Sequence, residues 1–236
     1  MVYAVSDLHG YPLERFQKLL ASADFSDDDY LFILGDIIDR NEDGGVPLLL
    51  WIMEQPNIEL ILGNHEAMLM ACDFLFDEIS EESIRNLNKA KTEALSIYLL
   101  NGGENTIKGL KKLSPENRGY VLEFLQDCPL YETVSAGDND YILVHSGFTN
   151  FSPDRKLSDY TADELLWTRP LISDNYFDDI ITVFGHTPTK YYGAQYAGKI
   201  IRTKTWINID AGAGSGEEPV LFRLDDGAEF RLNKND

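Results

Sequence analysis

The sequence predicts an α/β fold, a sheet-rich sandwich that carries a helical insertion. Three features of the 236 residues predict it. Short apolar runs rich in β-branched and aromatic residues recur along the chain, helical spacing separates several of them, and after Pro188 short strands alternate with Gly-rich turns. Strands flanked by helices early and hairpin-like strands late are typical of sheets that pack against helices. We expect residues 1–236 to form a single domain.

The strands are expected at seven runs, most of them apolar throughout, as in strands covered on both faces. These runs are Val2–Val5, Tyr30–Leu34, Ile58–Leu62, Tyr141–Val144, Ile180–Phe184, Thr205–Ile209 and Val220–Leu224. One helix is expected after Pro12, because proline suits a first helical turn, and a second over Val46–Met53. Residues 67–130 have few strand signals and repeat apolar residues at three- and four-residue steps, which predicts a helical insertion.

The composition argues against two classes of partner. Acidic residues number 40 and basic residues 20, giving a net charge of −20. Such a surface repels nucleic-acid backbones, and no Lys/Arg cluster offsets it locally, so no nucleic-acid partner is expected. No apolar run approaches the roughly 20 residues of a membrane helix. The chain opens directly into a strand-like segment without a targeting signal, so we expect a cytoplasmic protein that binds no membrane.

A polar motif follows each of five predicted strands. The motifs are Asp7-Leu8-His9-Gly10, Gly35-Asp36-Ile37-Ile38-Asp39-Arg40, Gly63-Asn64-His65-Glu66, His145-Ser146-Gly147 and Gly185-His186-Thr187-Pro188. Ligand sites form at the carboxyl ends of strands in open α/β sheets, so the five loops are expected to converge on one crevice. All four histidines of the chain lie in these motifs. A structural role explains any one of them, but chance is a poor explanation for all four.

The residue types in the motifs indicate metal ions. Imidazole, carboxylate and amide oxygen suit Mn, Fe or Zn, and the lack of cysteine in the motifs argues against a structural zinc site. Glycines beside the ligands permit sharp turns and close packing. Asp36 is the natural bridging ligand, because one carboxylate can hold two metals about 3.5–4 Å apart. We expect two divalent metal ions as cofactors, manganese first, with iron or zinc as alternatives.

With these motifs the sequence resembles the calcineurin-like metallophosphoesterases, and more narrowly the bacterial and phage phosphoprotein phosphatases, from Asp7 to about Asp210. The resemblance implies a sandwich of two mixed β-sheets flanked by helices. It implies a first metal held by Asp7, His9 and Asp36, and a second held by Asp36, Asn64, His145 and His186. His65 would be the general acid, oriented by Asp39. Arg40 would bind phosphate, as would Arg169 in a segment that resembles the family's Leu-Leu-Trp segment.

The expected reaction is hydrolysis of phosphomonoesters by direct attack of a metal-bridging hydroxide, with a Ser/Thr-type protein phosphatase as the main interpretation. The partner would be a phosphorylated protein or a small-molecule phosphate ester. The alternative is a symmetrical dinucleoside polyphosphate hydrolase or other nucleotide phosphohydrolase, which shares every metal motif. A catalytically inactive phosphate-binding domain is the remote alternative. Leu62 stands where several family members carry a basic residue that contacts phosphate, which leaves the metal chemistry intact but puts the substrate class in doubt.

Four further residues are expected to have no direct role in binding metal or phosphate. Glu66 is expected to be an acid in the first turn of a helix, where the helix dipole favours it. Asn208 and Asp210 are interpreted as mainly structural, and Trp167 as a core residue.

Overall fold

The computed structural model describes residues 1–78 and 80–234, and its strands form two mixed five-stranded sheets. In the first sheet the parallel strands β1, β2 and β3 continue into antiparallel β9 and β10, in the order β10-β9-β1-β2-β3. The bounds are β1 (Val2–Val5), β2 (Tyr30–Ile33), β3 (Ile58–Leu60), β9 (Leu221–Arg223) and β10 (Glu229–Phe230). The carboxyl ends of β1 and β2 are in register, since Val5 pairs with Ile33.

The second sheet has the order β4-β5-β6-β8-β7, with β5, β6 and β8 parallel and the two edge strands antiparallel to their neighbours. Its bounds are β4 (Tyr131–Ala136), β5 (Asn139–Val144), β6 (Ile181–Phe184), β7 (Ile201–Arg202) and β8 (Trp206–Asn208). The sheets therefore have the mixed, layered arrangement that the resemblance implies.

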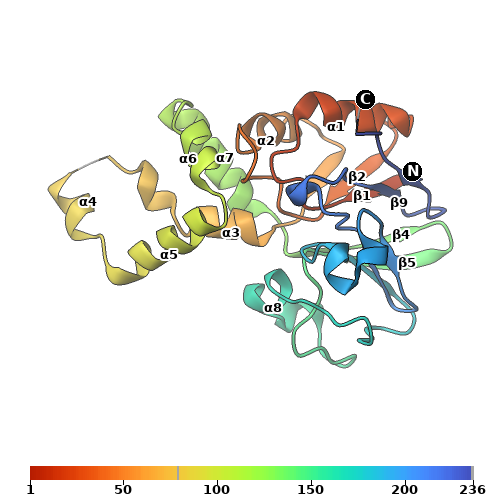
Figure 1. Cartoon of the computed structure of the whole chain (residues 1–236). Coiled ribbons are helices and arrows are strands. Elements are labelled where there is room, and N and C mark those ends of the chain that lie inside the picture. The colour runs from red at the N-terminus through yellow and green to blue at the C-terminus, as the bar shows by residue number, and fades with distance from the viewer. Residues whose placement is uncertain (79, 235–236) are drawn as a thin grey trace.

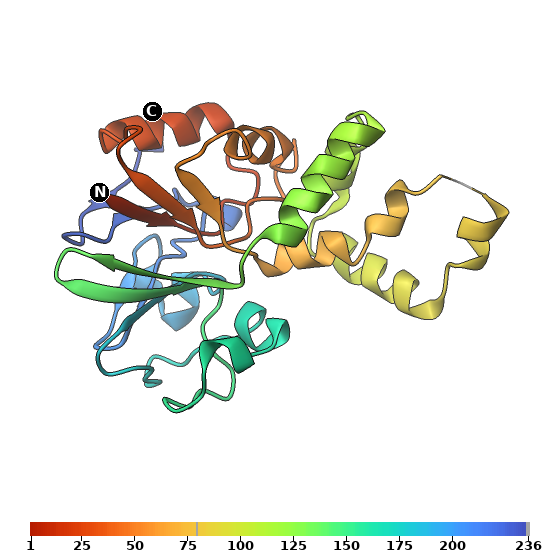
Figure 2. The same ribbon diagram turned by 180° about the vertical axis from the view of Figure 1, so that it is seen from behind.

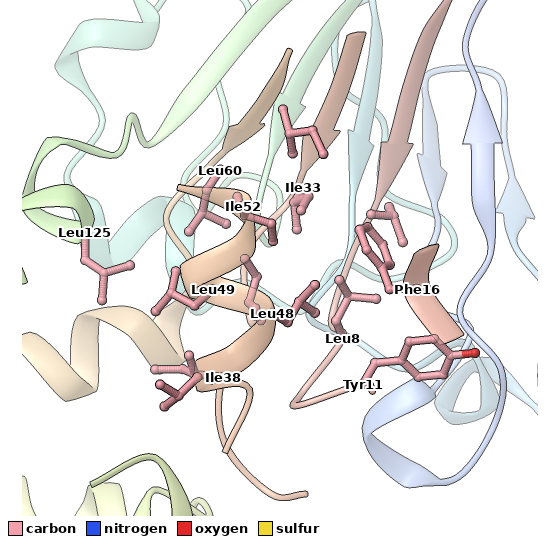
Figure 3. Close-up of a cluster of buried hydrophobic side chains, with 14 of the residues drawn as sticks. Leu8, Tyr11, Phe16, Ile33, Ile38, Leu48, Leu49, Ile52, Leu60 and Leu125 are labelled. Carbon is pink, nitrogen blue, oxygen red and sulfur yellow. The ribbon is translucent and has the colours of Figure 1, made fainter. Parts of the chain in front are cut away.

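Alternation along the strands divides the apolar side chains among three clusters. Ala4 on β1 and Leu143 on β5 belong to the cluster between the two sheets. Tyr3 and Val5 point to the other side of the first sheet and join a cluster with the helices that cover it. Figure 3 shows part of this second cluster, in which Leu48 and Leu49 of a covering helix pack toward Ile33 and Leu60. A third cluster around Phe184 and Trp206 covers the far face of the second sheet.

The helices lie in three groups (Figure 1). α1 (Leu13–Ser22) and α2 (Val46–Ile52) cover the outer face of the first sheet. α3 (Asn64–Met70), α4 (Glu81–Arg85), α5 (Lys89–Leu100), α6 (Glu104–Leu110) and α7 (Pro115–Asp127) form the predicted insertion, and α4 and α5 project away from the sheets (Figure 2). α8 (Ala162–Leu166) lies beside the second sheet. Short 3-10 segments span Asp73–Phe76, Leu157–Asp159, Thr189–Tyr192, Ala194–Tyr196 and Ala213–Ser215.

All seven expected strands are present, and three further strands, β4, β7 and β10, were not predicted. β4 alternates between more and less exposed positions instead of being apolar throughout, and β7 and β10 have only two residues each. No helix in the described residues is both long enough and apolar enough to cross a membrane.

Candidate active site

The structure brings together eight predicted side chains from both sheets. Asp7 follows β1, Asp36 follows β2, His145 follows β5 and His186 follows β6, while Asn64 begins α3 directly after β3. None of the eight residues is more than 6% exposed; they are Asp7, His9, Asp36, Asp39, Asn64, His65, His145 and His186. The five loops therefore converge as the placement at strand ends predicts.

The backbone at this site is strained. Among the described residues, eight other than glycine have a positive φ, and six of them are Asp7, His9, Asp36, Asp39, Arg40 and His186. Side chains other than those of Asn, Asp and His rarely adopt this region, and such conformations persist only where the surroundings enforce them. Left-handed conformations are therefore concentrated at the candidate site.

Two glycines make room for the carboxylates. A Cβ at Gly63 would overlap the backbone N and side-chain Oδ1 of Asp36, and a Cβ at Gly185 would overlap Oδ2 of Asp7. Any larger residue at either position would push a candidate ligand out of place. The close packing predicted from the glycines is therefore present.

The carboxylate of Asp36 lies between two groups of imidazoles. Its Oδ2 is 3.7 Å from Nε2 of His9 and 3.8 Å from Nε2 of His65, whereas its Oδ1 is 3.5 Å from Nε2 of His145. Two ligands that bind one Zn-like ion at about 2.0–2.2 Å lie at separations close to these. One oxygen faces each side, which is the arrangement expected of a bridging ligand.

The histidine nitrogens are arranged as metal ligands. Nδ1 of His145 lies 2.7 Å from the carbonyl of Leu34, and Nδ1 of His9 lies 3.3 Å from the carbonyl of Ile38, so each Nδ1 donates and leaves a lone pair on Nε2. Nε2 of His145 then faces Oδ1 of Asn64 at 2.9 Å. Nε2 of His186 is buried and has no hydrogen-bond partner among the described residues. A buried nitrogen without a partner calls for an explanation, and a bound cation supplies one, so the donor set fits metal ions.

Two groups of donors could each hold an ion. One comprises His9, Asp36 and His65, and the other Asp36, His145 and His186. The first group differs from the expected set, because it includes His65, while Oδ1 of Asp7 lies 3.9 Å from Nε2 of His9. Asp7 also accepts a hydrogen bond of 2.8 Å from the backbone N of His186, which links the two groups.

The electrostatics favour cations at this place. Burial, followed by the charge of Asp36, raises the pKa of Asp7 to about 6. Burial likewise raises the pKa of Asp36 and lowers the pKa of His145, and it lowers the pKa of His186 to about 2. The lowered pKa values of His145 and His186 favour their neutral, coordinating forms, and the buried carboxylates gain from any positive charge beside them.

His65 and Asp39 form a dyad held by the helical insertion. Nδ1 of His65 lies 2.6 Å from Oδ2 of Asp39. The other oxygen, Oδ1, accepts hydrogen bonds from the hydroxyls of Tyr98 (2.8 Å) and Thr106 (2.6 Å), which come from α5 and α6. Burial lowers the pKa of His65, but the charges of Asp36 and Asp39 outweigh it and the net shift is upward.

The two arginines contact different candidate histidines. Nη2 of Arg40 is 3.2 Å from Nε2 of His65. Nη1 of Arg169 donates to the carbonyl of His186 at 3.2 Å. Arg169 therefore lies beside the second group of donors.

Glu66 has a larger role than its place in the first turn of α3 suggests. Its carboxylate accepts hydrogen bonds from the backbone N of Asp36, Ile37 and Ile38, at 2.8–3.3 Å, and so fixes the loop that carries Asp36. Burial and the charge of Asp36 raise its pKa to about 7.

Two other interpretations change. Asp210 is 1% exposed, and its Oδ2 has no hydrogen-bond partner among the described residues. Burial and the charge of Asp7 raise the pKa of Asp210 well above its ordinary value, so Asp210 interacts electrostatically with the candidate ligands.

Trp167 is not a core residue: it is 44% exposed, and its ring lies edge-on 6.1 Å from that of His186. The sequence around Trp167 could not predict this exposure, because a single large apolar residue does not indicate whether its side chain is buried or faces solvent.

Comparisons with known proteins agree with this geometry. A family model described as calcineurin-like phosphoesterase matches residues 1–208. A protein from Acidovorax sp. (strain JS42), named symmetrical bis(5'-nucleosyl)-tetraphosphatase, is 28% identical over 166 residues, 70% of this chain and 47% of its own length. A protein of the same name from Haemophilus ducreyi is 26% identical over 200 residues, 80% of this chain and 59% of its own length. This chain thus spans about half the length of the curated relatives that it matches.

Solved structures share the fold. One provisionally described as a diadenosine tetraphosphatase superposes with a TM-score of 0.64, covering 98% of this chain and 92% of its own, at 17% identity. A protein serine/threonine phosphatase from Saccharomyces cerevisiae superposes with a TM-score of 0.51, covering 99% of this chain and 77% of its own, at 14% identity. At such identities the likeness shows the arrangement of the sheets and helices alone.

Proposed function

Because the chain belongs to the calcineurin-like phosphoesterase family, we propose that it is a metal-dependent phosphohydrolase that acts on dinucleoside polyphosphates. The observation that carries this choice is that the two arginines contact different candidate histidines. Nη2 of Arg40 contacts Nε2 of His65, whereas Nη1 of Arg169 contacts the carbonyl of His186. Two cations that accompany different candidate ligands are able to bind two phosphates of one chain, each through charge-assisted hydrogen bonds.

The candidate ligands would hold two divalent cations, which when bound activate water and neutralise phosphate oxygens. Asp36 would bridge them, and Glu66 would keep its loop in place through three backbone hydrogen bonds. His65 would give its proton to the departing phosphate oxygen, with Asp39 fixing the imidazole through Nδ1. Arg40 and Arg169 would each bind one phosphate of the chain and so orient the bond that breaks.

The relatives support this substrate over a phosphoprotein. Those from Acidovorax and Haemophilus ducreyi are both named symmetrical tetraphosphatases. The sequence alone favoured a Ser/Thr-type protein phosphatase, with the dinucleotide hydrolase as the alternative. Leu62 argues in the same direction as the relatives, since the apolar side chain is 8% exposed and supplies no charge for a terminal phosphate.

The test compares three substrates with the manganese-loaded protein. We expect kcat/KM to be higher for diadenosine tetraphosphate than for p-nitrophenyl phosphate or a phosphoserine peptide. Symmetrical cleavage should give ADP alone, which chromatography distinguishes from AMP plus ATP. A higher kcat/KM on the phosphopeptide would refute the proposed substrate.

The arginines supply a second test. Arg169→Ala should lower kcat/KM for diadenosine tetraphosphate by roughly one to two decades, the usual contribution of a hydrogen bond to a charged group. The loss on p-nitrophenyl phosphate should be smaller, because that substrate has only one phosphate. Arg85→Ala is the matched control, since Arg85 lies on α4 with its side chain 76% exposed. Equal losses on both substrates would mean that Arg169 serves a single phosphate.

A further inference from the structure

A cavity of about 490 Å³ adjoins the candidate metal centre on its His186 side. Two chain segments form it: the loop after α8 and the loop that leads from β6 into the 3-10 segment Thr189–Tyr192. The lining residues are Arg169, Pro170, Leu171, Ile172, Ser173, Thr187, Tyr191 and Tyr192. Its volume lies within the roughly 300–1,000 Å³ range of small-molecule sites. Because Thr187 follows His186 directly, the cavity and the centre share one loop.

The lining is apolar and aromatic, and much of it faces water. Tyr191 is 71% exposed, Leu171 66% and Ile172 48%. Exposed apolar side chains that gather around one hollow mark a binding site more often than isolated ones do. Tyrosine rings offer flat surfaces against which a nucleobase stacks, and branched aliphatic side chains add apolar contact around them.

The charge of the lining differs from that of the rest of the molecule. It contains one arginine and no acidic residue, in a chain with 40 acidic residues. Four other hollows on the described surface each include at least one carboxylate, from Asp140, from Asp27, from Glu42 and Asp43, or from Asp225 and Asp226. This cavity is therefore suited to a ligand that is apolar at one end and anionic at the other.

Arg169 lies where the two ends of such a ligand would meet. Its side chain lines the cavity, and its Nη1 is 3.2 Å from the carbonyl of His186, whose Nε2 is a candidate metal ligand. A phosphate chain that starts at the metals and passes Arg169 would thus lead into the cavity. His65 and Asp39 do not line the cavity, and His65 lies beside Oδ2 of Asp36, so an occupant here would leave the departing oxygen accessible to His65.

We propose that this cavity is a nucleoside subsite, which binds the base and sugar of one nucleotide of the substrate while Arg169 holds a phosphate of the same nucleotide. The inference rests on the proposed function, because the phosphate chain that leads into the cavity is the one assigned there. It adds to that function the residues that distinguish a nucleotide from a simple phosphate ester.

The experiment measures binding, with ADP and inorganic phosphate as the two probes. Each is titrated by calorimetry into the manganese-loaded protein and into two variants, Tyr191→Ala and Ile172→Asp. Both positions are exposed, so the variants should fold, which thermal unfolding verifies.

The affinity for ADP should fall on the order of tenfold in Tyr191→Ala, as for one lost base–aromatic stack. It should also fall in Ile172→Asp, which places a hydrated carboxylate where the base would bind, while Tyr191→Ala retains the affinity for phosphate. Tyr120→Ala is the control, because Tyr120 is 55% exposed on α7 and remote in sequence.

The outcomes separate this inference from the proposed function. If ADP binds both variants as well as it binds the parent protein, the cavity is no nucleoside subsite, even if diadenosine tetraphosphate is hydrolysed. If the variants lose ADP affinity in a protein that does not cleave diadenosine tetraphosphate, the subsite stands and the proposed substrate falls. If ADP affinity is unchanged while a phosphoserine peptide loses affinity, the cavity is a peptide groove and the inference is overturned.

Discussion

Asp39 shows how much of the candidate site depends on a single carboxylate. Its two oxygens accept hydrogen bonds from His65, Tyr98 and Thr106, and the residue is completely buried. Its φ is +79°, so the backbone is held in a region that aspartate adopts at a cost. The surroundings thus fix both the backbone and the side chain of the group that orients His65.

His65→Asn tests whether His65 donates a proton or binds a metal. If it is the general acid, the variant keeps both metal ions and kcat on diadenosine tetraphosphate falls by about 10²–10⁴-fold. The loss should be smaller on p-nitrophenyl phosphate, whose leaving group needs little protonation. Metal content by mass spectrometry and kcat on both substrates are the measurements.

Asn64→Ala is the comparison, since it should lose an ion. Loss of a metal from His65→Asn would instead place His65 with His9 and Asp36 as a ligand, which their 3.7–3.8 Å separations from Asp36 permit.

The motifs predicted which side chains meet, but not what holds them. Asp7, Asp36, His145 and His186 could be recognised because each directly follows an apolar strand. Tyr98 and Thr106 could not, because they lie 59 and 67 residues from Asp39 on helices whose packing no local pattern specifies. Asp210 could not be recognised as part of the site either, because it follows a strand without any accompanying histidine.

At the scale of elements, the helical insertion is joined to the candidate catalytic groups. Tyr98 of α5 and Thr106 of α6 bind Asp39, and the backbone N of Arg40 donates to the carbonyl of Gly102, between those helices. The insertion therefore positions the dyad as well as extending the surface. Helical spacing in residues 67–130 predicted the helices, but not this connection, which depends on tertiary packing.

Strand prediction succeeded where burial was two-sided. β1 and β6 are apolar runs whose ends coincide with motifs, and the structure has them at the expected positions. β4 is an edge strand with one exposed face, so it lacks the continuous apolar run that predicted the others.

Tyr98→Phe tests the positioning role of the insertion. Without this hydroxyl, Asp39 keeps only Thr106 as a donor to Oδ1, so the imidazole should be less well oriented and kcat should fall by about tenfold or more. The carboxylate should also attract the proton of His65 more strongly. The pKa of His65, already raised, should rise further, and since the protonated form is the active acid, the alkaline limb of the pH–rate profile should move to higher pH.

Tyr120→Phe is the matched control on α7, where the hydroxyl donates to the exposed Glu116. A purely structural role for Tyr98 would lower the unfolding temperature and leave the alkaline limb where it is in the parent protein.

At the scale of the whole molecule, the candidate site joins the two sheets. Asp7 and Asp36 extend from the first sheet, and His145 and His186 extend from the second. The hydrogen bond from His186 to Asp7 and the contact of His145 with the carbonyl of Leu34 already cross between them. Bound cations would add further links at the same junction, where the buried carboxylates Asp7, Asp36 and Asp210 gather.

Removal of metal should therefore destabilise the entire fold and not only the site. Without cations, the buried carboxylates Asp7, Asp36 and Asp210 lie close together, and burial raises the pKa of each. An ion that binds only the folded state stabilises it by about 2.7 kcal/mol at a free concentration 100 times its Kd. In a chain of this size that corresponds to roughly 5 to 10 °C in unfolding temperature.

Thermal unfolding of the chelated protein, followed by titration with manganese, should show a Tm that rises with free ion concentration. Asp36→Asn should largely abolish the rise, because it weakens the ligand shared by both ions. Glu123→Gln removes the same charge from an exposed position on α7 and should leave the rise intact. A Tm independent of manganese in the parent protein would show that the sheets are held together without the ions, and the metal assignment would fail.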